Sequence, residues 1–234
     1  MSDETSRVAE RYARRTATHD GADDRYSPLR PEVWQTLQER QRVLLQLLAA
    51  HDRRDLAALR LVEVGSGSGG NLLELLRLGF APRHLRGIEL LPERHAAARA
   101  ALPEAVALEL GDASVARIEP GSQDLVLAST VFSSLLDRAF QHHLADAMWS
   151  WLAPGGAVLW YDFTFDNPRN PDVRGVPLAR VRELFPAGLV DARRVTLAPP
   201  LARAVCRWHP ALYTAFNALP LLRTHLLAWI EKPR

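Results

Sequence analysis

The sequence predicts an α/β fold in which a doubly wound, mostly parallel sheet of seven strands carries helices on both faces. Short apolar segments of strand length alternate with segments of helical periodicity from residue 61 to residue 184. The first strand candidate ends directly in a glycine-rich turn, which is typical of a strand–turn–helix unit. The chain has 234 residues, which suits one domain with a modest appendage. Such alternation predicts parallel strands, because each helix carries the chain back across the sheet.

The elements are expected in sequence after an N-terminal extension. Residues 1–30 contain six acidic residues and six arginines but few large apolar ones, so this segment is either a disordered tail or an arm laid over the domain. A helix is expected from Pro31 to about residue 51, because proline suits a first helical turn and apolar residues then recur on one face. Strands are expected at residues 61–64, 85–90, 106–110, 124–128, 157–163, 189–197 and 224–230. Further helices are expected at residues 71–78, 92–101 and 136–152, before residue 184, and within the apolar stretch 199–221.

The composition restricts the class of protein. Basic and acidic residues nearly balance, at 29 against 27, which argues against a protein that coats nucleic acid. The single cysteine, Cys206, excludes an intramolecular disulfide framework and a cysteine-rich zinc site, and it fits a reducing cytoplasm. No apolar run approaches the ~18 residues that a membrane-spanning helix needs. We therefore expect a cytoplasmic protein without a transmembrane segment and without a nucleic-acid partner.

The glycine-rich turn at residues 63–70, with the sequence EVGSGSGG, lies between a strand candidate and a helix candidate. Free backbone N–H groups and the helix dipole favour an anionic group at such a turn, and the glycines let a ligand touch the backbone. Gly65, Gly67 and Gly70 also satisfy the spacing G-x-G-x-x-G, which suits a dinucleotide as well as a nucleoside. The alternative is a turn whose glycines serve close packing only.

Two carboxylates flank this turn. Glu89 ends the second expected strand, where a carboxylate can accept hydrogen bonds from both hydroxyls of a ribose. Glu63 precedes the turn, where a negative charge is unfavourable beside a pyrophosphate but favourable beside a ligand with an ammonium and a sulfonium group. Glu63 therefore favours an adenosine ligand with a cationic tail over a dinucleotide. An ordinary surface carboxylate is the alternative for Glu89.

In order and spacing, these motifs resemble those of the class I S-adenosylmethionine-dependent methyltransferases, over about residues 61–230. The resemblance also rests on Gly111-Asp112-Ala113, which is similar to the family's adenine contact, on residues 124–129 and on the L-x-P-G-G turn at residues 152–156. It implies S-adenosyl-L-methionine as the cofactor and a Rossmann-like sheet closed by an antiparallel C-terminal hairpin. The cofactor contacts that it implies are Glu63, Gly65, Ser66, Gly67, Gly69, Asn71, Glu89, Leu90, Asp112, Ala113 and Ser129. A plain helix cap is the alternative role for Asp112.

The acceptor side of the site is expected at residues 129–134 and 162–174 and in the N-terminal arm, because ligands of this fold class meet over the carboxyl ends of the strands. A sulfonium methyl group is already electrophilic, so the protein must align it with a nucleophile, exclude water and, for a hydroxyl, remove a proton. Asp162 is the candidate general base, with a buried structural hydrogen-bond acceptor as the alternative. Acceptor contacts are expected from Phe132, Asn167, Arg169, Asn170 and Arg174.

Residues 161–175, with the sequence YDFTFDNPRNPDVRG, are the least generic part of the chain. They resemble a bacterial subgroup of these methyltransferases that is loosely associated with glycan and secondary-metabolite pathways. Two arginines and two asparagines held by prolines form a donor-rich loop, which suits phosphate, carboxylate or sugar hydroxyls. The alternative is a loop whose asparagine and aspartate turns satisfy themselves.

The arm offers further cofactor contacts. Arg11, Tyr12, Arg14, Arg15 and Tyr26 could fold over the cofactor, with an arginine near the methionyl carboxylate and a tyrosine over the sulfonium through a cation–π contact, and Arg11 and Tyr12 are the expected cofactor contacts. A disordered tail is the alternative.

The histidines and the cysteine are expected to be structural. His142 and His143 are adjacent on one helix, where a solvated pair is expected. His209 and His225 have no carboxylate at ligand spacing, so we assign no metal. Cys206 is expected to be a small core residue.

The sequence thus predicts an N-terminal arm and helix at residues 1–55 and a methyltransferase domain at residues 56–234, with an apolar insertion at about 199–221. The expected function is methyl transfer to a small-molecule acceptor, with O-methylation of a glycan-related or secondary-metabolite acceptor as the expected reaction. A noncatalytic S-adenosylmethionine-binding protein and a nicotinamide-dependent reductase are the alternatives, the reductase disfavoured by Glu63 and the late hairpin. The insertion is either core packing or a docking surface for a membrane or partner, and a homodimer is left open.

Overall fold

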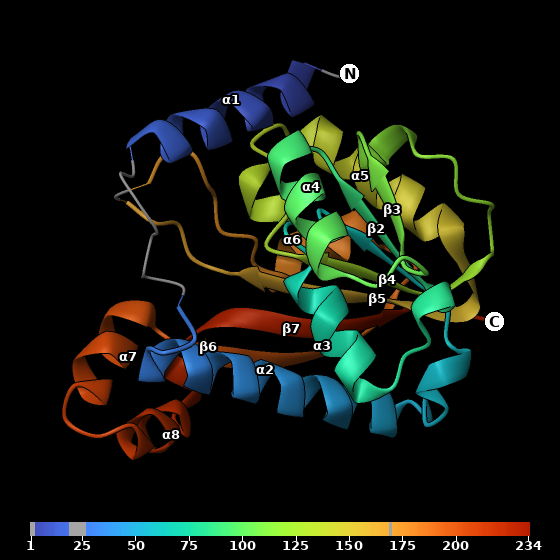
Figure 1. The fold of residues 1–234 in the computed structure, drawn as a ribbon. Coiled ribbons are helices and arrows are strands. Elements are labelled where there is room, and N and C mark those ends of the chain that lie inside the picture. The colour runs from blue at the N-terminus through green and yellow to red at the C-terminus, as the bar shows by residue number, and fades with distance from the viewer. Residues whose placement is uncertain (1–2, 19–26, 169) are drawn as a thin grey trace.

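The computed structural model describes residues 3–18, 27–168 and 170–234 (Figure 1). Within these residues a seven-stranded sheet has the order β3-β2-β1-β4-β5-β7-β6. Its strands are β1 (Leu61–Val64), β2 (Leu85–Glu89), β3 (Ala107–Leu110), β4 (Gln123–Ser129), β5 (Leu152–Phe163), β6 (Leu189–Leu197) and β7 (Arg223–Glu231). Neighbours pair in parallel except at β7, which is antiparallel to both β5 and β6. The predicted fold class, with its antiparallel C-terminal strand, is confirmed.

Helices cover both faces of the sheet (Figure 1). They are α1 (Asp3–Thr18), α2 (Pro31–Ala50), α3 (Gly70–Leu78), α4 (Pro92–Ala101), α5 (Arg138–Trp151), α6 (Leu178–Leu184), α7 (Pro199–Cys206) and α8 (Ala211–Asn217). Alternate strand residues enter opposite cores: Val62 packs with the side of α5 and α6, and Leu61 packs with the side of α2, α3 and α4. Both faces are buried, as is usual for a parallel sheet, and the carboxyl ends of the strands are left to form a site.

Two element boundaries differ from the sequence expectation for local reasons. The helix expected from residue 136 begins at Arg138, because the Asp137 carboxylate accepts hydrogen bonds from the backbone N–H groups of Ala139 (2.8 Å) and Phe140 (3.2 Å) and so caps it. The strand expected from residue 157 begins at Leu152, which already pairs with Gln123 before a register shift. The Pro-Gly-Gly turn therefore lies inside β5 as a bulge.

The N-terminal segment, left open between a tail and an arm, forms α1 over residues 3–18. Val8 is buried in the core cluster of the α5 side, and α1 lies across one end of the domain (Figure 1). Tyr26 lies outside the described residues. Within the described residues, no helix combines the length and the apolar character that crossing a membrane requires.

The apolar insertion between β6 and β7 forms α7, α8 and a final short turn. Its inner side has a small core of its own, which includes the buried Val205, Cys206 and Tyr213. The hydroxyl group of Tyr213 donates a hydrogen bond to the buried Glu39 of α2 (2.8 Å). The insertion is thus fastened to α2 at the carboxyl end of the sheet.

Candidate active site

The turn between β1 and α3 leaves room for a ligand at one glycine and serves packing at another. Gly67 has φ of +56°, in the left-handed region, and a Cβ atom built on it would meet nothing within 4 Å. A Cβ atom on Gly69 would lie 2.8 Å from the side chain of Leu102. The packing role expected as the alternative therefore applies to Gly69, and the open space at Gly67 is compatible with a ligand role, which stays a prediction.

Glu89 holds this turn from the end of β2. Its carboxylate is buried and accepts hydrogen bonds from the backbone N–H groups of Gly67 (2.7 Å) and Leu91 (2.9 Å). Each carboxylate oxygen keeps a lone pair toward the adjoining cavity, whose wall includes Glu89. The residue is therefore a buried, anchored anion and not an ordinary surface carboxylate.

A cavity lies over the carboxyl ends of β1, β2 and β4 and under α1. Seven residues expected to bind the cofactor line it: Gly65, Glu89, Leu90, Asp112, Ala113, Ser129 and Tyr12. The cavity wall does not include six others: Glu63, Ser66, Gly67, Gly69, Asn71 and Arg11. Asp112 caps the following turn, because its Oδ1 accepts hydrogen bonds from the N–H (2.9 Å) and hydroxyl (2.7 Å) of Ser114. Its second carboxylate oxygen is not used by that cap.

Glu63 lies behind the glycine-rich turn as a fully buried carboxyl group. Its Oε1 accepts a hydrogen bond from Asn71 Nδ2 (2.5 Å), and its Oε2 has no partner among the described residues. Burial raises the pKa of Glu63 to about 8, although Asn71 and the nearby Arg40 act in the opposite direction. A buried carboxylate oxygen without a donor fits a ligand that brings a cationic group, as the ammonium group of S-adenosylmethionine does.

The two cofactor contacts expected on helix α1 have different positions: Tyr12 lines the cavity, and Arg11 attaches the helix to the rest of the domain. Tyr12 lines the cavity, and the guanidinium carbon of Arg94 lies 4.3 Å from its ring centroid. Arg11 is buried between α1 and the segment at Ser134. Its guanidinium group donates hydrogen bonds to the Glu4 carboxylate (2.8 Å) and to the backbone carbonyl of Ser134 (2.8 Å). The guanidinium of Arg11 is therefore engaged away from the position expected for it beside the methionyl carboxylate.

The candidate base Asp162 is only 1% exposed, and both of its carboxylate oxygens are engaged. Oδ2 accepts from the backbone N–H of Ser133 (3.0 Å) and Oδ1 from that of Phe163 (3.0 Å). Burial raises the pKa of Asp162 to about 7. Phe132 is also buried, with its ring packed on Trp160 at 4.5 Å. Neither Asp162 nor Phe132 lines the cavity.

In the loop after β5, the side chain of Asn170 forms a turn, whereas that of Arg174 is exposed to solvent. Asn170 Oδ1 accepts a hydrogen bond from the N–H of Asp172 (3.2 Å), and the N–H of Asn170 donates to the carbonyl of Asn167 (2.9 Å). Arg174 is anchored by its backbone N–H, which donates to Ser133 (2.8 Å), and its side chain is exposed. Arg169 lies outside the described residues.

A polar cluster missed by the sequence reasoning lies at the carboxyl end of β5, on the side of α2. The ring of His225 stacks on that of Tyr161 (centroids 5.1 Å apart, planes at 16°), and Arg40 lies 5.3 Å from the centroid of the Tyr161 ring. Tyr161 Oη lies 2.9 Å from Thr196 Oγ1. The backbone carbonyl of Tyr161 accepts a hydrogen bond from the N–H of Thr130 (2.7 Å), a cavity residue, whereas the cavity wall does not include Tyr161, His225 or Arg40.

Burial lowers the pKa of His225 to about 4, and the charge of Arg40 acts in the same direction. The imidazole is therefore neutral near pH 7. His225 Nδ1 lies 3.0 Å from Thr224 Oγ1. The sequence signal that could have found this residue is its position: it begins β7, the antiparallel strand, directly opposite Phe163 of β5.

Comparison with known proteins agrees with this geometry. Residues 61–156 match a family model described as a methyltransferase domain. The structure of 1,6-didemethyltoxoflavin-N1-methyltransferase from Burkholderia thailandensis, which contains 1,6-didemethyltoxoflavin and S-adenosylhomocysteine, matches with 18% identity and a TM-score of 0.65, covering 100% of this chain and 92% of that one. A search of curated proteins gives no match.

Two further structures show the range of proteins with this fold. Phosphoethanolamine N-methyltransferase 1 from Haemonchus contortus, in complex with phosphoethanolamine and S-adenosylhomocysteine, matches with 14% identity and a TM-score of 0.64, covering 100% of this chain and 50% of that one. The cyclase SpnF matches with 16% identity and a TM-score of 0.60, covering 82% of this chain and 80% of that one. At these identities the structures establish the fold.

The family match contains the strands and turns that form the cofactor side of the cavity. Its residues provide an anchored carboxylate, Glu89, in the cavity wall and a buried carboxyl group, Glu63, whose Oε2 accepts no hydrogen bond from the described residues, and these fit S-adenosylmethionine. S-adenosylmethionine is the cofactor that this geometry and the matched methyltransferase domain fit, and the match does not favour the reductase alternative. Residues 61–156 are therefore similar to a methyltransferase domain, and the seven-stranded sheet has the strand arrangement that the resemblance to the class I S-adenosylmethionine-dependent methyltransferases implies.

Proposed function

We propose that the protein transfers the methyl group of S-adenosylmethionine to a hydroxyl group of a small-molecule acceptor. The observation that carries this proposal is His225, whose imidazole stacks on Tyr161 at the carboxyl end of β5 and is neutral near pH 7. A hydroxyl is a poor nucleophile until its proton is removed, and a neutral imidazole is a suitable acceptor for that proton. When bound, the sulfonium supplies an electrophilic methyl group and a neutral thioether leaving group.

The steps assigned to this chain follow from that arrangement. The acceptor oxygen forms a bond to the methyl carbon as the bond from that carbon to sulfur breaks, and the hydroxyl proton passes to His225 Nε2. The ring of Tyr161 stacks on the imidazole, and burial, followed by the charge of Arg40, lowers the pKa of His225 and so keeps it unprotonated near pH 7. Asp162 is assigned a positioning role, because its carboxylate holds the turn at residues 132–134 against β5.

The acceptor is proposed to be a glycan-related or other secondary-metabolite molecule with hydroxyl or anionic groups. Arg174 supports this proposal, because its side chain is exposed and its backbone N–H is hydrogen-bonded near the end of the loop after β5. Arg14 of α1 forms an ion pair with Asp172 of the same loop (3.3 Å), so the loop and the arm face one another. Asn167, Arg169 and Asn170 are proposed as further contacts. The two methyltransferase neighbours, solved with small molecules bound, support a small acceptor.

The experiment measures S-adenosylhomocysteine formation by the purified full chain in the presence of sugar, sugar-nucleotide and polyphenol acceptors. With an active acceptor, we expect the His225→Gln variant to lose at least tenfold in kcat while its affinity for S-adenosylhomocysteine stays within twofold. His209→Gln, on the exposed turn of the insertion, is the matched control and should keep full activity.

The pH profile provides a second readout. Because the pKa of His225 is lowered to about 4, its basic form persists well below neutral pH, and kcat should not fall on acidification from pH 7 to pH 5.5 for lack of this base. Wild-type kcat in the His225→Gln variant would refute the base assignment. Binding of S-adenosylhomocysteine without methyl transfer to any acceptor would favour the noncatalytic alternative.

A further inference from the structure

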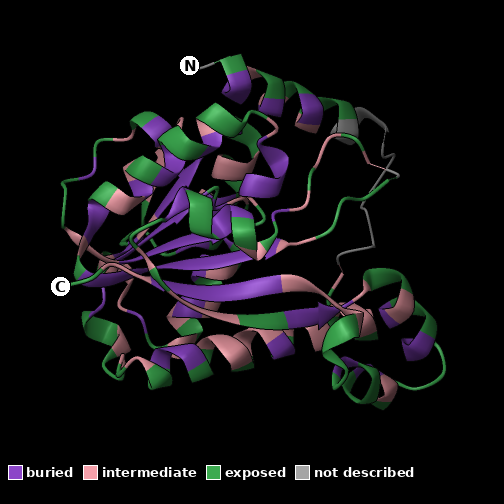
Figure 2. Cartoon of the chain, turned by 180° about the vertical axis from the view of Figure 1, so that it is seen from behind, coloured by how far each residue is buried: buried purple, intermediate pink, exposed green. Residues whose placement is uncertain are grey.

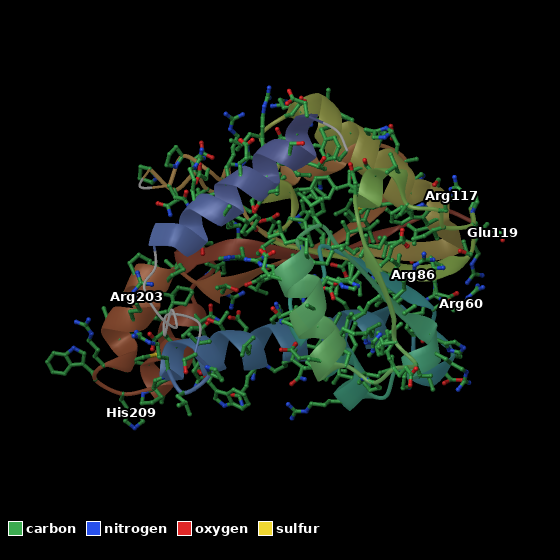
Figure 3. All side chains as sticks on the ribbon, turned by 45° about the horizontal axis from the view of Figure 1, so that its top comes forward. Arg60, Arg86, Arg117, Glu119, Arg203 and His209 are labelled. Atoms are coloured by element: carbon green, nitrogen blue, oxygen red, sulfur yellow. The ribbon has the colours of Figure 1, made fainter. Side chains whose placement is uncertain are left out.

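The insertion between β6 and β7, called here the helical cap (residues 199–222), has an unusual charge composition. The whole stretch from residue 192 to residue 230 contains no aspartate or glutamate, although the chain has 27 of them. The cap itself carries Arg203, Arg207 and His209, all exposed, and Figure 3 shows Arg203 and His209 at the same end of the molecule. The cap is therefore a basic surface on a chain whose charges nearly balance.

The cap also exposes large apolar side chains. Trp208, in the turn between α7 and α8, is 87% exposed, and Leu221, in the turn after α8, is 88% exposed. Leu219 and Phe216 are exposed as well. Figure 2 shows the cap as a projection with exposed outer parts. Isolated exposed leucines are common, but a tryptophan and two leucines on one short insertion call for an explanation.

Internal packing does not explain these side chains, because the cap already has a separate inner core. Val205 and Cys206 of α7 and Tyr213 of α8 are buried against Leu197 and α2. The outer residues are not part of that core. The helical cap thus has an apolar inner face that fixes it to the domain and an apolar, basic outer surface without a partner among the described residues.

The combination of exposed groups identifies the chemistry of the surface that this outer side fits. Tryptophan favours the headgroup region of a bilayer, leucine enters the adjoining acyl region, and arginine is attracted to anionic headgroups. A surface without carboxylates avoids repulsion from those headgroups. Trp34 at the start of α2 is also exposed, and α2 packs against both cap helices, which extends the apolar area.

We propose that the helical cap docks the protein peripherally on an anionic lipid bilayer. Trp208 and Leu221 insert at the level of the headgroups, and Arg203 and Arg207 lie against the phosphate groups. The proposal is independent of the proposed acceptor, because it concerns the outer surface of the cap and not the cavity. Docking at this point sets the carboxyl end of the sheet close to the bilayer.

The test uses the full chain and sedimentation with vesicles of phosphatidylcholine alone or mixed with phosphatidylglycerol. We expect binding to the anionic vesicles, weakened by 0.5 M salt. The double variant Arg203→Glu, Arg207→Glu should lower the partition coefficient by at least 30-fold, since each basic residue near such a surface contributes roughly a factor of five. Trp208→Ser should lower it by about tenfold or more.

Matched controls separate docking from general surface effects. Leu189→Ser replaces an exposed leucine (61%) at the opposite end of β6, and Arg83→Glu reverses an exposed charge on the far part of the domain. Both should sediment like the wild type, and all variants should keep the wild-type melting temperature and affinity for S-adenosylhomocysteine. Equal binding of the charge-reversed variant, or no binding of the wild type to anionic vesicles, overturns the proposal. So does self-association that Trp208→Ser abolishes without any vesicle binding.

Discussion

Replacing Glu63 with glutamine should make the ligand-free protein more stable at neutral and alkaline pH. The glutamine oxygen can still accept from Asn71, while the group that replaces Oε2 carries no charge to be buried. In the folded protein the pKa of Glu63 is raised from 4.5 to about 8, so the unfolded chain releases this proton first as the pH rises. The wild type therefore loses stability from pH 4.5 to pH 8, and the loss approaches ~5 kcal/mol at 1.36 kcal/mol per pH unit.

Urea unfolding of both proteins without ligand, at intervals between pH 4.5 and pH 8.5, measures this effect. The difference in unfolding free energy between Glu63→Gln and the wild type should increase with pH, by ~3 kcal/mol between pH 4.5 and pH 7. Any cost of burying the unpaired amide of the Glu63→Gln variant does not depend on pH, so it cancels when the differences in unfolding free energy at two pH values are compared. Glu74→Gln, which removes a partly exposed carboxylate from the same cluster, is the matched control variant.

The same variant should bind S-adenosylhomocysteine more weakly, because the glutamine cannot release a proton and become negatively charged when the ammonium group binds, as the carboxyl group of Glu63 can. Stability and binding thus change in opposite directions, which a simple packing defect does not produce. Parallel stability curves for the wild type and Glu63→Gln across this pH range would refute the assignment of a buried, protonated carboxyl group.

Four further predictions follow from the site. Glu89→Gln should weaken S-adenosylhomocysteine binding by ~1.5–3 kcal/mol in calorimetry, because hydrogen bonds to a charged acceptor are lost. Removal of residues 1–18 should leave the circular dichroism of the sheet intact and lower the same affinity at least tenfold, since α1 forms one wall of the cavity. Arg11→Ala should lower the melting temperature through the loss of two buried hydrogen bonds, whereas the exposed Arg7→Ala should not. Arg174→Ala should raise the acceptor KM without changing cofactor affinity, with poor rescue by lysine, and unchanged kinetics would move the acceptor site elsewhere.

The strands and the glycine-rich turn could be predicted from the sequence because their determinants are local. The run Leu61 to Val64 is apolar except for Glu63 and is followed by glycines, so its length and boundary follow from its own residues. The late strands were predictable for the same reason. Their hydrophobic alternation continues after the insertion, and the structure gives them nearly the expected bounds.

The arm and the acceptor side depend on contacts between distant parts of the chain. Arg11 finds its carbonyl partner 123 positions away at Ser134, which no local pattern indicates. His225 becomes a neutral, stacked imidazole only because β7 lies beside β5 and α2 brings Arg40 close. Asp162 lies at the end of its strand as expected, but the segment at residue 133 folds back onto its carboxylate.

The helical cap joins the sheet in a way that allows a different insertion to replace it. Leu197 and Arg223 are the last paired residues of the β6–β7 ladder, and the N–H of Ala198 then donates to the carbonyl of Leu222 (2.8 Å). The chain therefore leaves and re-enters the sheet at adjacent points, as in a long hairpin loop. Grafting a cap of different length or composition there requires no change of strand register, and the contacts to be redesigned are those of the cap with α2 and with the ends of β6 and β7, such as the hydrogen bonds of Tyr213 to Glu39 and Thr36. New acceptors or new cellular attachments can thus arise in this fold by replacing one loop while the cofactor site stays unchanged.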